Sequence, residues 1–255
     1  MGEALSVLGK AFFASDALGK AIVLLLVVAS LWSWSIILLK WTGMVKVRRG
    51  CRRFMRSYQN SSPLKMGVSL SEDDEMPLDC VCRAGIESLK EVLARSELRG
   101  SYSVLEMYFK LPRALTSAEV EKIRSSMVRA MNIQRIRLED MMVTLSTIVT
   151  LAPFAGLLGT VWGVMMVFFQ MGMTKRPEIS DMAPGVSSAL LTTVIGLLVA
   201  IPAVVGNNMI TGDIDRTCDQ MEIFVDDFLA SLQLEENLYR PPAMEGGMTP
   251  PPANA

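Results

Sequence analysis

Two threonines, Thr160 and Thr193, stand in stretches without any charged residue, at 141–174 and 182–212. A hydroxyl group can both donate and accept a hydrogen bond, and it is costly to leave unpaired in an apolar setting. At 1.5 Å per helical residue, the two threonines lie about 21 and 18 Å from the connection between the stretches. We therefore predict that the two hydroxyls meet at one level, where they can bind a polar side chain of an inserted helix or hold water.

Small residues surround both threonines. Glycines recur three and four residues apart in the first stretch, and Ser188, Thr192, Gly196 and Ala200 follow at four-residue steps in the second. Such faces let helix backbones approach closely. Two prolines each remove a backbone hydrogen bond, which leaves a carbonyl for water or a partner to satisfy. The predicted packing and kink residues are Pro153, Gly156, Gly159, Gly163, Gly196 and Pro202. Close helix packing alone, without any transport, is the alternative interpretation.

Other chemistry finds little support in the sequence. The chain contains no histidine, so the commonest general base and metal ligand is absent. Its cysteines are Cys51, Cys80, Cys82 and Cys218, and one Cys-x-Cys pair without a second pair or a histidine is a weak zinc signal. Neither a phosphate-binding loop nor a nucleophile elbow occurs. We expect no enzyme activity, no metal, no cofactor and no nucleic-acid partner.

The elements that position the threonines are predicted to be membrane helices. Of the 255 residues 51% are hydrophobic, and the mean hydropathy is +0.35. A helix needs about 20 apolar residues to cross the hydrocarbon core, and 21–39 is a third stretch without charge. That stretch resembles a signal peptide cleaved at Ala29, but its apolar run continues well beyond that residue, which favours a span.

Orientation is predicted from the basic residues. Seven of them (Lys40, Lys46, Arg48, Arg49, Arg52, Arg53 and Arg56) follow the first span with no acid among them, and basic loops favour the cytoplasm. The predicted order is a periplasmic segment 1–20, transmembrane helix 21–40, cytoplasmic helical domain 41–140, helix 141–174 with the second span, periplasmic hairpin 175–181, third span 182–212, cytoplasmic amphipathic helix 213–240 and disordered tail 241–255.

Two cytoplasmic features accompany the spans. After an irregular stretch at 57–79, we expect a helix capped by Thr116 or Ser117 that runs straight into the second span. Beyond the third span an apolar seam is formed by Ile214, Cys218, Met221, Val225, Phe228 and Leu232. It predicts an amphipathic helix that packs within this subunit's own helical bundle or against other subunits.

LAPFAGLLGTVWGVMMVF, followed by APGVSSALLTTVIGLLVAIPAV, resembles the family of TolQ, ExbB and MotA, inner-membrane proton-channel proteins. The motifs cover 151–208, and the arrangement of spans matches across the rest. The end of the first span (SWSIILLK) and the GTVWG core look closer to the TolQ branch than to the ExbB branch. The fold implied is all-α, with three transmembrane helices, the second and third extending into a cytoplasmic bundle.

The resemblance implies a pentamer whose second and third spans line a pore around the helices of TolR-like or ExbD-like single-span subunits. An aspartate on that partner helix would carry the proton, facing Thr160 and Thr193, and the motion would pass to TolA, or to TonB in the ExbB case. Where relatives commonly have a glutamate, this sequence has Ser188, so the partner must supply the carboxylate. Ser188 with water is the remaining candidate of this chain.

Three functions remain open at this point. The first is a proton-conducting motor subunit of the Tol-Pal system in the bacterial inner membrane. The second is an ExbB-like role in energising TonB-dependent uptake through the outer membrane. The third, of a different class, is a membrane scaffold that packs helices and conducts nothing.

Overall fold

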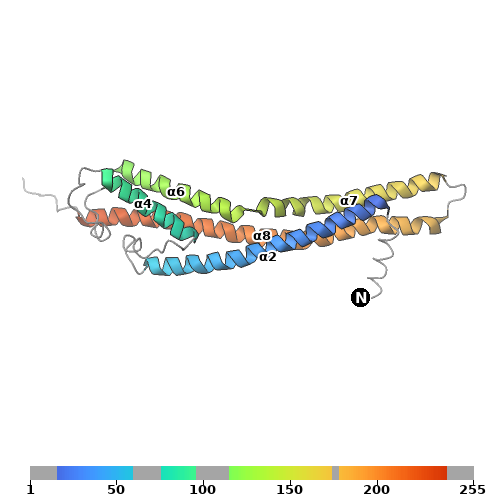
Figure 1. Cartoon of the computed structure of the whole chain (residues 1–255), viewed down its shortest axis with the longest axis horizontal. Coiled ribbons are helices and arrows are strands. Elements are labelled where there is room, and N and C mark those ends of the chain that lie inside the picture. Colours follow the sequence, from blue (N-terminus) through green and yellow to red (C-terminus); the bar gives the residue numbers. More distant parts are fainter. Residues whose placement is uncertain (1–15, 60–75, 96–114, 174–177, 240–255) are drawn as a thin grey trace, which may run out of the picture. The chain divides into compact units, whose positions relative to one another are not determined.

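The structure, a computed structural model, describes residues 16–59, 76–95, 115–173 and 178–239, and within these ranges it contains helices and no strand. The elements are α2 (Ala17–Gln59), α4 (Pro77–Arg95), α6 (Ser117–Glu139), α7 (Met142–Met173) and α8 (Ile179–Tyr239) (Figure 1). Three of them, α2, α7 and α8, are long and apolar enough to cross a membrane. The predicted all-α membrane fold is confirmed.

Several predicted boundaries differ from these helices. The first and third spans are parts of longer helices, because α2 continues to Gln59 and α8 runs without interruption through the position of the expected boundary at 212–213. Part of the predicted hairpin 175–181 belongs to α8, which begins at Ile179, and its residues 175–177 lie outside the described residues. Residues 1–15 of the predicted periplasmic segment and the predicted tail 241–255 lie outside the described residues.

The expected passage from the cytoplasmic helix straight into the second span is wrong. Helix α6 ends at Glu139, and α7 begins at Met142 after a two-residue turn. Met141 in that turn has a φ of 60°, in the left-handed region that ends helices. Lys40 of α2 donates a 3.0 Å hydrogen bond from Nζ to the carbonyl oxygen of Leu138. This bond satisfies one of the carbonyls that a helix end leaves open.

The chain divides into two compact units. One of them, Val47–Arg135 with Thr217–Ala255, has a core built from the end of α2, from α4, from α6 and from the end of α8. Phe224 lies at its centre, with ring centroids 5.1 Å from both Phe54 and Tyr58. Four seam residues of the predicted amphipathic helix are buried in this core: Met221, Val225, Phe228 and Leu232. The seam therefore packs within its own subunit.

The start of α6 shows why that helix begins where it does. Thr116 accepts a hydrogen bond at its hydroxyl from the amide of Glu119, and the carboxylate of Glu119 accepts one of 2.8 Å from the amide of Thr116. This reciprocal arrangement is a capping box. It confirms the helix start predicted at Thr116 or Ser117.

The other unit, Met1–Lys46 with Ile136–Arg216, contains the apolar parts of α2, α7 and α8. Here α2 packs through Leu26 on Ala152 and Ala200. Many large apolar side chains stay exposed, for example Leu31, Phe154 and Leu198 at 69%, 62% and 64%. Exposed apolar surface on this scale fits contact with lipid or with other membrane helices.

Candidate functional site

Helices α7 and α8 run antiparallel, as Figure 1 shows. The distances at their glycines show that the two backbones are in close contact. A Cβ atom added at Gly196 would meet the carbonyl oxygen of Ala152 at 2.7 Å, and one added at Gly163 would meet the Cβ of Ala189 at 2.6 Å. Between them, a Cβ at Gly159 would lie 2.5 Å from the hydroxyl oxygen of Thr192. The small residues of one helix thus face those of the other, as packing of this kind requires.

Thr160 and Thr193 meet at this contact. Their hydroxyl oxygens are hydrogen-bonded to each other across the two helices. Each hydroxyl also lies 3.0 Å from the carbonyl oxygen of Gly156. The sequence places these two threonines at one depth, and the structure brings them into direct contact, while their role in proton transfer stays a prediction.

Thr192 is a third hydroxyl at the same carbonyl, and sequence reasoning did not include it among the site residues. It is 1% exposed and lies 3.0 Å from the Gly156 oxygen and 2.7 Å from that of Ala189. The sequence feature that could have indicated Thr192 is its position on the small-residue face of α8, between Ser188 and Gly196. Because Thr192 is fully buried while Thr193 is half-buried, only the latter has open surface to offer a further group.

Ser188 does not join the threonine pair. It is 6% exposed, and its hydroxyl donates a 2.8 Å hydrogen bond to the carbonyl oxygen of Gly185. Five residues along a helix turn the side chain by about 140°, so Ser188 and Thr193 lie on different sides of α8. The predicted part of Ser188 in a proton pathway has no contact with the pair to support it here.

The predicted packing residues lie in the same contact. Gly156, Gly159 and Gly196 are buried between α7 and α8. Pro153 and Pro202 stand inside helices that continue through them. The role of these prolines as kinks stays a prediction.

The site has the chemistry of a hydroxyl cluster without a charged group. A carbonyl oxygen has two lone pairs, whereas three hydroxyls lie within hydrogen-bond distance of that of Gly156. Each hydroxyl has a single proton, which can go to this carbonyl or to another acceptor such as the partner threonine or the carbonyl of Ala189, while lone pairs of the hydroxyl oxygens stay free to accept. In a segment with no ionisable residue, such a cluster can pair with a carboxyl group brought by another helix, in its protonated and its ionised form alike.

The helices and this site define a polytopic α-helical membrane protein. The chain belongs to the MotA/TolQ/ExbB proton channel family, whose model matches residues 87–223. The matched region includes the whole contact between α7 and α8 described above.

Individual relatives come from two branches of the family. The Tol-Pal system protein TolQ of Pseudomonas aeruginosa is 27% identical over 214 residues, which cover 83% of this chain and 86% of that protein. TolQ of Haemophilus influenzae is 35% identical over 116 residues, covering 44% of this chain and 51% of its own length. The biopolymer transport protein ExbB of Neisseria meningitidis serogroup A is 26% identical over 219 residues, covering 83% and 94%.

Proposed function

We propose that this protein is the proton-conducting motor subunit of a Tol-Pal system in the bacterial inner membrane. In this role it couples the proton gradient to force that reaches the outer membrane, and so serves envelope integrity and cell division. The family and the TolQ relatives support this role. The chain acts as a channel part and not as an enzyme.

The observation that carries the proposal is the contact of Thr160 with Thr193 at the Gly156 carbonyl. A carboxyl group that cycles between its acid and its ionised form needs a neighbour that accepts a hydrogen bond in one state and donates one in the other. A single hydroxyl group does both. The pair thus suits a proton carrier that belongs to a second protein.

The partners in this proposal are inferred from the need for a proton-carrying carboxyl group on a second protein. The carboxyl group is the intramembrane aspartate of a TolR-like (ExbD-like) single-span subunit, held inside a pentamer of this chain, and TolA receives the motion. Exposed apolar side chains on α2, α7 and α8 supply the surfaces for lipid and for neighbouring copies. Basic residues exposed along α2, such as Lys46, Arg49 and Arg53, support a cytoplasmic 41–140 region, a periplasmic N-terminus and a cytoplasmic C-terminus.

An ExbB-like role in TonB-dependent uptake is the second candidate. The meningococcal ExbB covers as much of this chain as the Pseudomonas TolQ does, at nearly the same identity. The partner separates the two roles. Loss of a Tol role produces leaky envelopes and chaining cells, whereas loss of an ExbB-like role produces failure under iron starvation.

The first experiment purifies the complex through a tag placed after Arg240 and weighs it intact while the co-purifying chains are identified. A fixed oligomer that holds a single-span protein with one intramembrane aspartate is expected. A bare oligomer at stable stoichiometry would contradict the proposal and favour a scaffold that conducts nothing.

The second experiment is the double variant Thr160→Ala with Thr193→Ala. It should abolish proton flux in proteoliposomes while the complex still assembles. Thr144→Ala is the matched control, because Thr144 is an exposed hydroxyl on the same helix α7, away from the pair. Full flux in the double variant would refute the role of the hydroxyl pair.

A further inference from the structure

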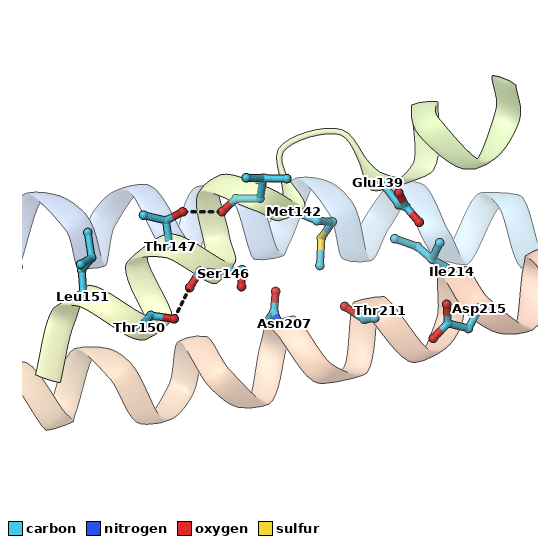
Figure 2. A pocket seen from close by; sticks show the side chains of 11 residues that line it. Glu139, Met142, Ser146, Thr147, Thr150, Leu151, Asn207, Thr211, Ile214 and Asp215 are labelled. Carbon is cyan, nitrogen blue, oxygen red and sulfur yellow. Dashed lines mark hydrogen bonds between the residues drawn. The ribbon is translucent and has the colours of Figure 1, made fainter. Parts of the chain in front are cut away.

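A cavity of about 680 Å³ opens beside α7 and α8, nearer to the start of α7 than the threonine pair. Polar side chains line it from both helices: Ser146, Thr147 and Thr150 from α7, and Asn207 and Thr211 from α8. Figure 2 shows the side chain of Asn207 rising from α8 toward α7. Two carboxylates, Glu139 and Asp215, stand at its end. At roughly 30 Å³ for each molecule of liquid water, the volume suffices for about twenty waters.

The polar groups of this cavity favour water and cations. The hydroxyl of Thr147 donates a 2.8 Å hydrogen bond to the carbonyl oxygen of Val143, and the hydroxyl of Thr150 donates one of 3.0 Å to the carbonyl oxygen of Ser146. Both hydroxyl oxygens thus present acceptor lone pairs. Among the residues that the structure describes, no lysine or arginine lines the cavity. Polar side chains in a membrane helix characteristically face a bundle interior or a water-filled space, since lipid cannot satisfy them.

The cavity continues the face that carries the threonine pair. Thr211 follows Thr193 by eighteen residues, which is five full turns, so both lie on one side of α8. On α7, Ser146 precedes Thr160 by fourteen residues and lies within about 40° of the same side. Between the two levels lie exposed apolar residues, with Leu157 and Leu197 at 53% and 44%. One face therefore presents a hydroxyl pair, then an apolar section, then a polar cavity.

We propose that this cavity is the water-filled outlet through which protons leave the threonine level for the cytoplasm. The inference rests on the proposed proton-conducting function. The carboxyl group of the partner helix carries the proton past the apolar section and releases it to the first water of the cavity. The proton then hops from one water oxygen to the next, and each water receives one proton and passes one on. Asp215 or Glu139 accepts the proton at the mouth and releases it to bulk water, so no bond other than O–H is made or broken.

The first test measures whether water reaches the cavity. Asn207→Cys and Thr211→Cys are made separately in a protein in which Cys80 and Cys218 are serine, leaving only the two buried cysteines. A membrane-impermeant maleimide applied to the cytoplasmic face of inverted vesicles should label both. Leu198→Cys, exposed on α8 but outside the cavity lining, is the control and should stay unlabelled. If all three stay unlabelled in the assembled complex, another helix fills the cavity, and the inference is wrong.

The second test measures proton flux through the intact complex in proteoliposomes, with and without Na⁺. The double variant Thr150→Val with Thr211→Val should lower the flux about tenfold. A barrier raised by roughly the free energy of one hydrogen bond slows transfer by about this factor. Thr144→Val, outside the cavity lining, should leave it unchanged. Unchanged flux in the cavity variant overturns the outlet alone, and so does flux that requires Na⁺. A native complex that moves no protons overturns the proposed function and the outlet together.

Discussion

The hydroxyl of Thr193 lies 3.0 Å from the carbonyl oxygen of Gly156, and this contact joins α8 to α7. The glycine makes the contact possible, because a Cβ at position 156 would lie 2.9 Å from the carbonyl oxygen of Thr192 and 3.0 Å from the Cα of Thr193. Both of those atoms belong to the backbone, so neither can move aside as a flexible side chain would. The close packing of the two backbones and the hydrogen bond of the Thr193 hydroxyl therefore depend on the same glycine.

Gly196 gives a direct test of that packing. In Gly196→Ala the new methyl group would meet the carbonyl oxygen of Ala152 at 2.7 Å, and such overpacking costs about 1–3 kcal/mol. We expect a lower unfolding midpoint in detergent. Gly172→Ala is the control, because nothing lies within 4 Å of a Cβ there, and alanine favours a helix by up to about 1 kcal/mol. Equal midpoints for the two variants would contradict the observed register of α7 and α8.

Thr192 and Thr193 are neighbours whose hydroxyls should serve different purposes. Thr192→Val removes a buried hydrogen bond, so stability should fall by about 1 kcal/mol while proton flux persists. Thr193→Val should keep the fold but lower the flux about tenfold or more, since a half-buried hydroxyl can reach a partner's carboxyl group. Flux in proteoliposomes and thermal unfolding of the same preparations separate the two effects. An equal loss of flux in both variants would favour a purely structural role for Thr193.

The depth of Thr160 and Thr193 was predictable because helix rise depends on residue number alone, and the small-residue face indicated a close partner. The break at Met141 was not predictable, since neither glycine nor proline marks it and methionine rarely adopts a positive φ. The direction of the Ser188 hydroxyl was not predictable either, and its part in a proton pathway stays a prediction. Its place in the sequence says nothing about whether its hydroxyl turns outward or bonds to its own helix. The cavity near Asn207 was not predictable either, because residues from two helices form it together.

Phe224 should contribute far more to stability than the charged pair nearby. It is fully buried between the rings of Phe54 and Tyr58, and Phe224→Ala should cost about 3–5 kcal/mol. Asp226 forms a 3.0 Å ion pair with Arg124, but both side chains are at least half exposed. Asp226→Ala should therefore cost less than about 1 kcal/mol. Denaturant unfolding of each variant measures both costs, and comparable values would show that this core is not where the unit gains its stability.

Cys82 lies in the same core as Phe224 and should make the stability of that unit fall at alkaline pH. Burial, together with the nearby negative charge of Asp79, raises the pKa of its thiol from 9.0 to about 12. The same causes raise the pKa of Cys51 to about 11. A raised pKa means that the unfolded chain loses its thiol proton first. The stabilising contribution is therefore complete below pH 9 and is lost as the pH rises from there through about 12, at about 1.4 kcal/mol per pH unit for one thiol.

Two measurements check this dependence. Iodoacetamide at pH 8 should leave Cys82 unmodified in the folded protein, because only the thiolate reacts, and modify it after unfolding. The free energy of unfolding should also fall more steeply between pH 9 and 10.5 in the native protein than in Cys82→Ala, a comparison that removes the effect of other titrating groups. Rapid modification of Cys82 in the folded state, or parallel curves for the two proteins, would show that the thiol is not held in its protonated form.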